Sequence, residues 1–245
     1  MKFFILFLCL FALFNGCESN ANKKEISSKT AIKLSQDYLE KCKRHEKTDS
    51  TENLIAQFEF TKLCSQLNTD EKKMCFWLNF YNASIQKQLR QNSKLIENEE
   101  LFFKQQSTFV AGEKFSLNDI ENQILRRKKS QREIFNTLKV NKLDPRIHFA
   151  LNCGAKSCPP ILFYEVGKLE AQLDLATQSY LLTECEYKNE KLYLPMLFLW
   201  FKEDFGGDEG VFDFLRKYKL LNSELNPQIE YLKYDWKLNL GNYIF

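Results

Sequence analysis

The sequence predicts a single α+β domain in which helices predominate and the strands form short antiparallel hairpins. The 245 residues include only 8 Gly and 5 Pro, which argues against a loop-rich all-β fold. Apolar residues recur at helical spacing over most of the chain, whereas two short segments with central turn residues have an extended pattern. The 22 Phe supply enough apolar side chain for a sizeable core.

Three helices are predicted in the first part of the chain. Residues 28–42 and 54–67 each place their apolar side chains on one face. Residues 68–70 provide a helix N-cap for residues 71–91, which are apolar nearly all round between Met74 and Ile85. We therefore expect this third helix to be central and buried, with Trp77 in the core.

The middle of the chain begins with a predicted hairpin, residues 108–116, that turns at Gly112. Residues 116–119 resemble a capping box and predict a helix that ends near residue 126. The basic residues 126–132 are expected to be exposed, and residues 169–182 are expected to form a helix.

The last part of the chain alternates between the two patterns. Residues 185–195 predict a second hairpin, and residues 196–205 and 211–218 predict short helices. The triplet Asp204-Phe205-Gly206 matches a kinase motif in letters only, because no glycine-rich or catalytic loop accompanies it, so we interpret it as a helix end. Residues 230–239 alternate like a strand.

The N-terminus has the pattern of a secretory signal. A single Lys precedes the apolar residues 3–14, and small or polar residues follow them. This apolar run is too short to span a bilayer, which requires about 20 residues. We expect residues 1–16 to be a signal peptide and the protein to be exported.

Cys17 is a candidate lipidation site. It directly follows Gly16, in an arrangement that resembles a bacterial lipobox, and the polar residues 17–27 would form a lipidated tether. Phe14 and Asn15 are bulkier than the usual pattern, so cleavage without lipidation is the alternative. The expected location is the periplasm or the outer or cell membrane. Residues 28–245 are expected to form one domain.

Charge and motifs exclude several classes of function. The formal net charge of +3 gives no electrostatic footprint for nucleic acid. The Walker, Rossmann, nucleophile-elbow and HExxH patterns are absent, so no cofactor or metal is predicted. Without the signal peptide and Cys17, six cysteines remain, enough for up to three disulfides in an oxidising envelope, and none forms a CxxC motif.

Four sequence motifs together resemble one protein family. They are CFWLNFYNASI (75–85), SLNDIENQILR (116–126), DPRIHFALNCGAKSCPP (144–160) and YDWKLN (234–239). In this order they are similar to the domain-of-unknown-function 547 family, over about residues 50–240. The resemblance implies a bacterial envelope protein and no particular activity. The family tends to have Ala where this chain has Cys75, so Cys75 is not expected to be catalytic.

His148, Cys153 and Cys158 form the main candidate site. His148 lies in an apolar run, whereas His45 lies among charged residues and is expected at the surface. If Gly154 lets the chain fold back, Cys153 could approach the imidazole and be activated as a nucleophile. The alternatives are a buried histidine with core or disulfide cysteines, or a metal site whose His-x4-Cys-x4-Cys spacing is unusual for zinc.

Four further residues are candidates for binding. Asn79 and Asn82 lie three apart on the aromatic helix and need partners if they are buried. They either orient backbone turns or line a pocket. Glu121 is expected to form a structural salt bridge with an arginine such as Arg146, unless it lines a site.

Two functions of different classes remain open. The favoured one is a non-catalytic binding or structural module that takes a peptide, glycan or small molecule. The alternative is a cysteine-dependent hydrolase, transferase or thiol enzyme that uses Cys153 as nucleophile and His148 as base.

Overall fold

A computed structural model of the chain describes residues 29–222 and 226–244. The expected signal peptide and Cys17 tether lie outside these residues. The α-helices are α2 (Ala31–Lys43), α3 (Asp49–Ala56), α4 (Phe60–Gln66), α5 (Asp70–Gln91), α6 (Glu99–Lys104), α7 (Glu133–Leu138), α8 (Leu169–Glu184), α9 (Leu197–Trp200), α10 (Lys202–Phe205) and α11 (Gly207–Lys217). The other helical turns are η1 (Ser93–Asn98), η2 (Asp119–Leu125) and η3 (Pro145–Phe149). The strands are β1 (Thr108–Val110), β2 (Glu113–Phe115), β3 (Glu186–Lys188), β4 (Lys191–Pro195) and β5 (Gln228–Leu232).

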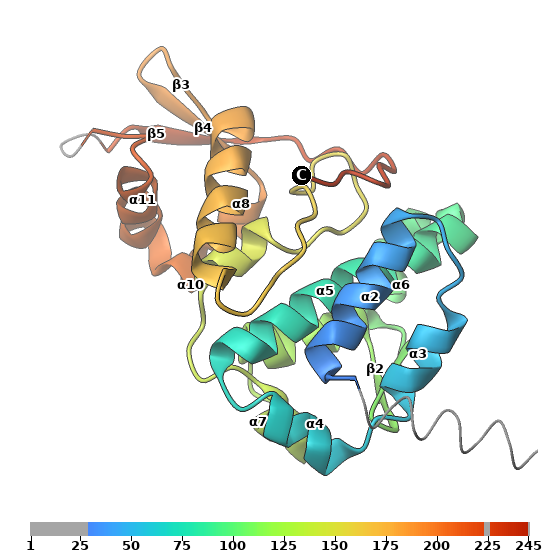
Figure 1. The fold of residues 1–245 in the computed structure, drawn as a ribbon. Helices are drawn as coiled ribbons and strands as arrows, with labels where there is room; N and C mark the ends of the chain where they lie inside the picture. Colours follow the sequence, from blue (N-terminus) through green and yellow to red (C-terminus); the bar gives the residue numbers. More distant parts are fainter. Residues whose placement is uncertain (1–28, 223–225, 245) are drawn as a thin grey trace, which may run out of the picture.

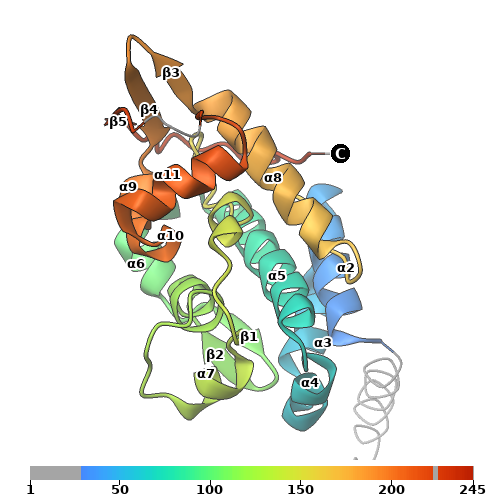
Figure 2. The same cartoon turned by 90° about the vertical axis from the view of Figure 1, so that its left-hand side faces the viewer.

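The helices and the two small sheets enclose two neighbouring apolar clusters. The larger cluster surrounds α5 and includes side chains from α2, η2 and the hairpin β1–β2. The smaller one joins Phe149 of η3, helix α8, the strands β4 and β5 and the helices α9 to α11. Figure 1 shows these two groups of elements side by side, and in Figure 2 helix α5 runs through the middle of the molecule. The α+β class with predominating helices is confirmed.

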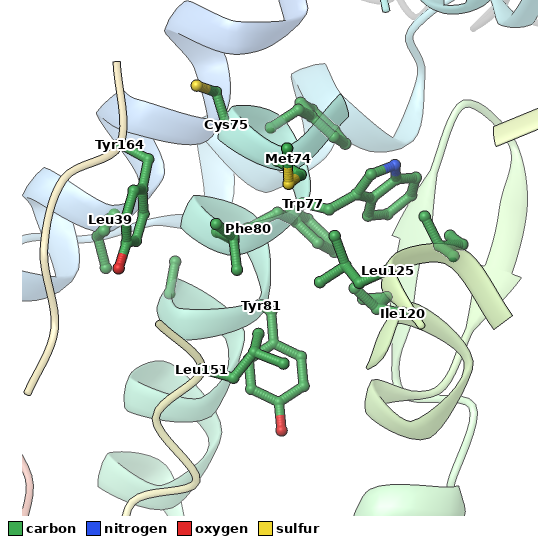
Figure 3. Close-up of a cluster of buried hydrophobic side chains, with 14 of the residues drawn as sticks. Leu39, Met74, Cys75, Trp77, Phe80, Tyr81, Ile120, Leu125, Leu151 and Tyr164 are labelled. Atoms are coloured by element: carbon green, nitrogen blue, oxygen red, sulfur yellow. The ribbon is translucent and has the colours of Figure 1, made fainter. Parts of the chain in front are cut away.

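Helix α5 is the centre of the larger cluster, as its sequence predicts. The Thr69 hydroxyl caps it by accepting a hydrogen bond from the Lys72 backbone N–H, and acidic residues occupy its first turn, where the helix dipole favours them. Trp77 is completely buried and packs against Phe115 of β2 at 5.4 Å between ring centroids. Figure 3 shows Trp77 beside Ile120 and Leu125, with Tyr81 one turn further along α5.

The predicted single helix over residues 54–67 is wrong, because the chain forms α3 and α4 with a break between them. Glu59 has extended backbone dihedrals, and its carboxylate accepts hydrogen bonds from the backbone N–H groups of Thr61 and Lys62. A side chain that caps the second helix in this way ends the first, since the two conformations exclude one another.

Both predicted hairpins are present, but the strands are not all antiparallel. The turn between β3 and β4 has Asn189 and Glu190 with positive φ, as in a type I′ hairpin turn. Strand β5 pairs parallel to β4, with Leu192 opposite Ile229. The helices α9 to α11 carry the chain back to the start of the sheet, and such a crossover permits parallel pairing.

The amide side chains of Asn79 and Asn82 attach the segment 150–164 to α5. Asn82 donates to the Ala150 carbonyl and accepts from the Asn152 N–H, both at 2.9 Å. Asn79 makes the same pair of bonds, also at 2.9 Å, with the backbone of Tyr164. Both amides are fully buried, so the structure gives them the role of orienting backbone turns. Within residues 29–222 and 226–244, no helix is long and apolar enough to cross a membrane.

Candidate functional site

A pocket with a volume of about 260 Å³ lies at the junction of the two clusters. Its walls are contributed by α5, α6, η2, η3, the loop 151–159, helix α9 with the residue that follows it, and the tail 234–236. Most of the lining is apolar or aromatic, and the ionisable residues in it are His148 and Glu121 together with Tyr81 and Tyr234. A mainly apolar cavity with a few convergent polar groups is the usual form of a small-molecule site.

His148 lines this pocket. Its imidazole is held by Asp204, which is in turn bonded to Arg126. Its Nε2 lies 2.9 Å from Oδ2 of Asp204, and the Arg126 guanidinium donates to the same carboxylate oxygen. The imidazole also stacks on Phe201, with 3.9 Å between ring centroids. These contacts fix both the position and the plane of the ring.

The charges in this network follow from burial and pairing. Although burial opposes ionisation, the hydrogen bonds from His148 and Arg126 hold the pKa of Asp204 well below its usual range. Burial of the imidazole lowers the pKa of His148, against the opposite pull of Asp204. At neutral pH, Nε2–H of a neutral His148 therefore donates to an ionised Asp204. Within the described part of the chain Nδ1 has no hydrogen-bond partner, so it remains an acceptor.

Glu121 lies on a π-helix, the rare helix with i→i+5 hydrogen bonds that is often found at functional sites. The predicted capping box starts it, since Ser116 and Asp119 bond each other's backbone N–H groups at 2.9 and 3.0 Å. Burial raises the pKa of Glu121, and its carboxyl group faces the Tyr81 hydroxyl. The pocket thus contains a carboxyl group whose ionisation is opposed by burial.

Cys153 and Cys158 form a disulfide in the pocket wall. The Tyr234 hydroxyl lies 3.0 Å from the sulfur of Cys153 and 3.1 Å from that of Cys158. Because disulfide sulfurs carry no proton, the hydroxyl is the donor. The backbone N–H of Cys153 also donates to the Cys158 sulfur, at 2.9 Å. Gly154 adopts φ +85°, which turns the chain back as its sequence position indicated.

Three aromatic side chains stand at the mouth of the pocket. Tyr234 lies 4.9 Å from Trp200 and 4.7 Å from Trp236 between ring centroids. The two indoles remain 45% and 36% exposed, respectively, unlike the buried Trp77. Exposed aromatic side chains around a cavity are typical of ligand-binding surfaces.

The structure brings together four of the seven candidate binding and catalytic residues. His148, Glu121, Cys153 and Cys158 all line the pocket. Of the alternatives for the two cysteines, the structure contains the disulfide, so neither sulfur is a thiol in this state. No hydrogen bond joins His148 to Cys153 among the described residues, because the imidazole bonds Asp204 instead.

The expected pairing of Glu121 with Arg146 is wrong. The Arg146 guanidinium is bonded to three carboxylates, those of Asp144, Glu170 and Asp174. It lies outside this pocket, as do Asn79 and Asn82. The geometry of η3 explains the result, because its helical turn places Arg146 and His148 on different sides of the segment.

Sequence reasoning missed the residues that orient His148. Arg126 belongs to a basic run that was expected to be exposed, yet its side chain is only 7% exposed. Asp204 is at a helix end, as expected, but it also supplies the acceptor for His148. Tyr234 and Trp236 belong to the YDWKLN motif, which was the only signal that the tail approaches the site.

The four remaining described cysteines are free. Burial raises the pKa of Cys42, Cys75 and Cys185 to about 12 and also raises that of Cys64, so none is an activated nucleophile. Within residues 29–222 and 226–244, no group of three or more His, Cys, Asp or Glu side chains is arranged to hold a metal ion.

These features define a helical α+β protein with an aromatic-lined pocket and a buried ionisable network. The family described as Protein of unknown function, DUF547, matches residues 64–181, which confirms the resemblance found in the motifs. The match includes η3, the disulfide and Glu121, whereas Asp204 and Tyr234 lie beyond it and extend the site into the last part of the chain. No curated protein and no solved structure matches the chain.

Glu121→Gln is expected to stabilise the protein at neutral pH. Burial raises the pKa of Glu121 in the folded state, so folding favours the protonated carboxyl group. The stability that this gives is present below the pKa of the unfolded chain, about 4.3, and is lost as the pH rises through the raised pKa of the folded state. Tyr81, Arg126, Asp204 and Lys128 are the groups that act on this carboxyl. In urea unfolding, the variant should match the wild type at pH 4 and exceed it by about 1 kcal/mol at pH 7.

The control for this measurement is Glu97→Gln, because Glu97 is exposed on η1. It should leave the free energy of unfolding unchanged at both pH values. A Glu121→Gln variant that is less stable than the wild type at pH 7 would mean that the native carboxyl is ionised and paired.

Proposed function

We propose that this protein is an envelope binding module whose pocket takes a small neutral molecule with an apolar body and one polar group. The observation that carries this proposal is the pocket itself, which combines aromatic walls with the unpaired acceptor Nδ1 of His148 and the buried carboxyl of Glu121. The apolar walls favour burial of a ring or alkyl group. The acceptor, together with a carboxyl group whose ionisation burial opposes, favours a hydroxyl, amide or thiol over an ion.

Benzyl alcohol is a suitable probe because it has one aromatic ring and one hydroxyl. Saturation-transfer NMR and calorimetric titration should detect its binding, and His148→Leu should weaken the affinity about three- to tenfold through loss of one hydrogen bond. Leu182→Ala is the control, since Leu182 is the most exposed of the large apolar side chains in the described residues and does not line the pocket. Absence of binding at millimolar probe, or equal affinity in the His148→Leu variant, would contradict the proposal.

A hydrolase or transferase that uses His148 as general base is the second candidate. It is supported by the 2.9 Å bond to Asp204, since a carboxylate that fixes the tautomer of a histidine is the usual partner of a catalytic imidazole. Cys153 could act as its nucleophile only after the disulfide is reduced. Hydrolysis of p-nitrophenyl esters that requires both a reductant and His148 would favour this candidate over the binding module.

We further infer that the protein is exported and anchored to a membrane through lipidated Cys17. The apolar residues 3–14 and the position of Gly16 before Cys17 support this inference. The Cys153–Cys158 disulfide also supports it, because structural disulfides persist mainly in oxidising compartments.

Cys17→Ser is expected to release the protein from membranes and to leave its fold unchanged. A diacyl or triacyl group anchors a protein firmly, whereas loss of the acceptor thiol leaves no site for it. Fractionation of cells that express the full chain should move the variant from the membrane to the soluble exported fraction. The Cys64→Ser variant should remain with the membrane. A wild-type protein found wholly soluble after export would contradict anchoring through Cys17.

A further inference from the structure

We propose that the Cys153–Cys158 disulfide is a reactive group that undergoes thiol–disulfide exchange with a small neutral thiol bound in the pocket. This proposal rests on the proposed binding function, because the thiol is the polar group of the ligand. Both cysteines line the pocket, so a bound molecule meets the disulfide directly. A purely structural crosslink has no need to form the wall of a binding cavity.

The two sulfurs have different surroundings, which assigns them different roles. Cys153 is partly exposed, whereas Cys158 is only 4% exposed. Two donors lie within reach of the Cys158 sulfur, the backbone N–H of Cys153 at 2.9 Å and the Tyr234 hydroxyl at 3.1 Å. The hydroxyl also lies 3.0 Å from the Cys153 sulfur, so the backbone N–H is the donor that distinguishes the two sulfurs. Donors placed where negative charge develops stabilise a leaving anion. The accessible Cys153 sulfur is therefore the point of attack, and Cys158 is the leaving thiolate.

The exchange step balances without a further reactant. The ligand thiol loses its proton to water and attacks the Cys153 sulfur as a thiolate. A new S–S bond joins the ligand to Cys153, and the bond between Cys153 and Cys158 breaks. Its electron pair stays on the Cys158 sulfur, which accepts hydrogen bonds from the two donors and then takes a proton from water. The ligand sulfur is oxidised to the level of a disulfide, and the Cys158 sulfur is reduced to a thiol.

The pocket also indicates which thiols react. Asp204 is the ionised carboxylate behind His148, and its charge is matched by Arg126, while burial disfavours ionisation of His148 and Glu121. Burial thus opposes charge in the mainly apolar pocket, and the aromatic side chains at its mouth favour a ring. Benzyl mercaptan fits these conditions, whereas 2-mercaptoethanesulfonate has a charge that the pocket does not match.

The products can be located because trypsin cuts between the two cysteines. Cleavage after Arg146, Lys156 and Lys168 yields one peptide with Cys153 and another with Cys158. The oxidised protein is mixed with benzyl mercaptan, quenched with acid and N-ethylmaleimide, digested and analysed by mass spectrometry. The benzylthio group is expected on Cys153 and the maleimide on Cys158. A benzylthio group on Cys158, or one divided evenly between the two, would overturn the assignment.

Rates provide the second test. Loss of one hydrogen bond to a developing thiolate should make exchange about tenfold slower in Tyr234→Phe, while Tyr187→Phe, an exposed tyrosine on β3, should react like the wild type. For each thiol, the rate of exchange with the protein is divided by its rate with oxidised glutathione. This ratio should be at least about fivefold higher for benzyl mercaptan than for 2-mercaptoethanesulfonate. Equal rates in Tyr234→Phe and wild type, or no preference between the thiols, would overturn the proposal. If Tyr234→Phe does not fold, the preference for benzyl mercaptan and the position of the adduct still test the proposal.

The two proposals fail in different ways. Benzyl alcohol should inhibit the exchange competitively if it occupies the same pocket as benzyl mercaptan. Binding of benzyl alcohol without any exchange by benzyl mercaptan would overturn the exchange reaction and leave the binding function. Exchange at Cys153 that benzyl alcohol does not inhibit would overturn the pocket as the binding site.

Discussion

Replacing Trp77 by alanine is expected to lower the free energy of unfolding by about 3–5 kcal/mol. The indole is completely buried at the centre of α5, in tilted or edge contact with the rings of Phe76, Phe80 and Phe115. Its removal leaves a cavity between α5 and the β1–β2 hairpin that the surrounding helices can fill only in part. For a domain of ordinary stability, this loss is enough to unfold much of the population.

The matched control is Trp200→Ala, because Trp200 is about half exposed at the mouth of the pocket. Urea unfolding followed by circular dichroism should show a small change for Trp200→Ala and a large one for Trp77→Ala. A Trp77→Ala variant with an unchanged melting temperature would contradict the central position of α5.

Arg126→Ala is expected to cost a similar amount, about 3–5 kcal/mol, for an electrostatic reason. Arg126 and Asp204 have side chains that are 7% and 11% exposed, so loss of the guanidinium leaves a buried carboxylate with His148 as its remaining partner. The pKa of Asp204 should then rise, since one of its two hydrogen-bond donors is gone. The pKa of His148 should rise as well, because Arg126 no longer repels the imidazolium.

Two measurements test this second prediction. Urea unfolding at pH 7 should show the loss of stability in Arg126→Ala and almost none in Lys129→Ala, which alters an exposed residue of the same basic run. Titration of the His148 ring protons by NMR should show the shift in pKa. If Arg126→Ala and Lys129→Ala behave alike, the guanidinium does not pair with Asp204 in solution.

The elements that could be predicted are those whose signal is local. Helices α5 and α8 and the turn at Asn189 follow from apolar spacing, capping residues and turn chemistry within a few positions of the chain. The division between α3 and α4 escaped prediction because Glu59 caps a helix from within an apolar pattern. The parallel pairing of β5 with β4 depends on contacts between distant segments, and no local pattern reports them.

The candidate site shows the same distinction. His148, Cys153 and Cys158 lie within eleven residues of one another, so their proximity could be considered from the sequence. Asp204 is 56 residues from His148 and 78 from Arg126 along the chain. Only tertiary packing joins these three side chains, and each has an ordinary local interpretation on its own, as a helix end, a core histidine or a solvated charge.

The tail 233–244 has a consequence for the order in which the molecule assembles. Its backbone bonds the 155–161 loop at several points, including the bridge between Ala155 and Leu238, and the Gly241 N–H donates to Gln86 of α5 across 155 residues. Tyr234 reaches the disulfide across 76 and 81 residues. Closure of such long loops is the slow part of folding, and the tail follows in the chain everything that it contacts. The helices around α5 can therefore form while the cysteine loop is still uncovered, and oxidation of the two thiols can precede the arrival of the aromatic wall that shields them.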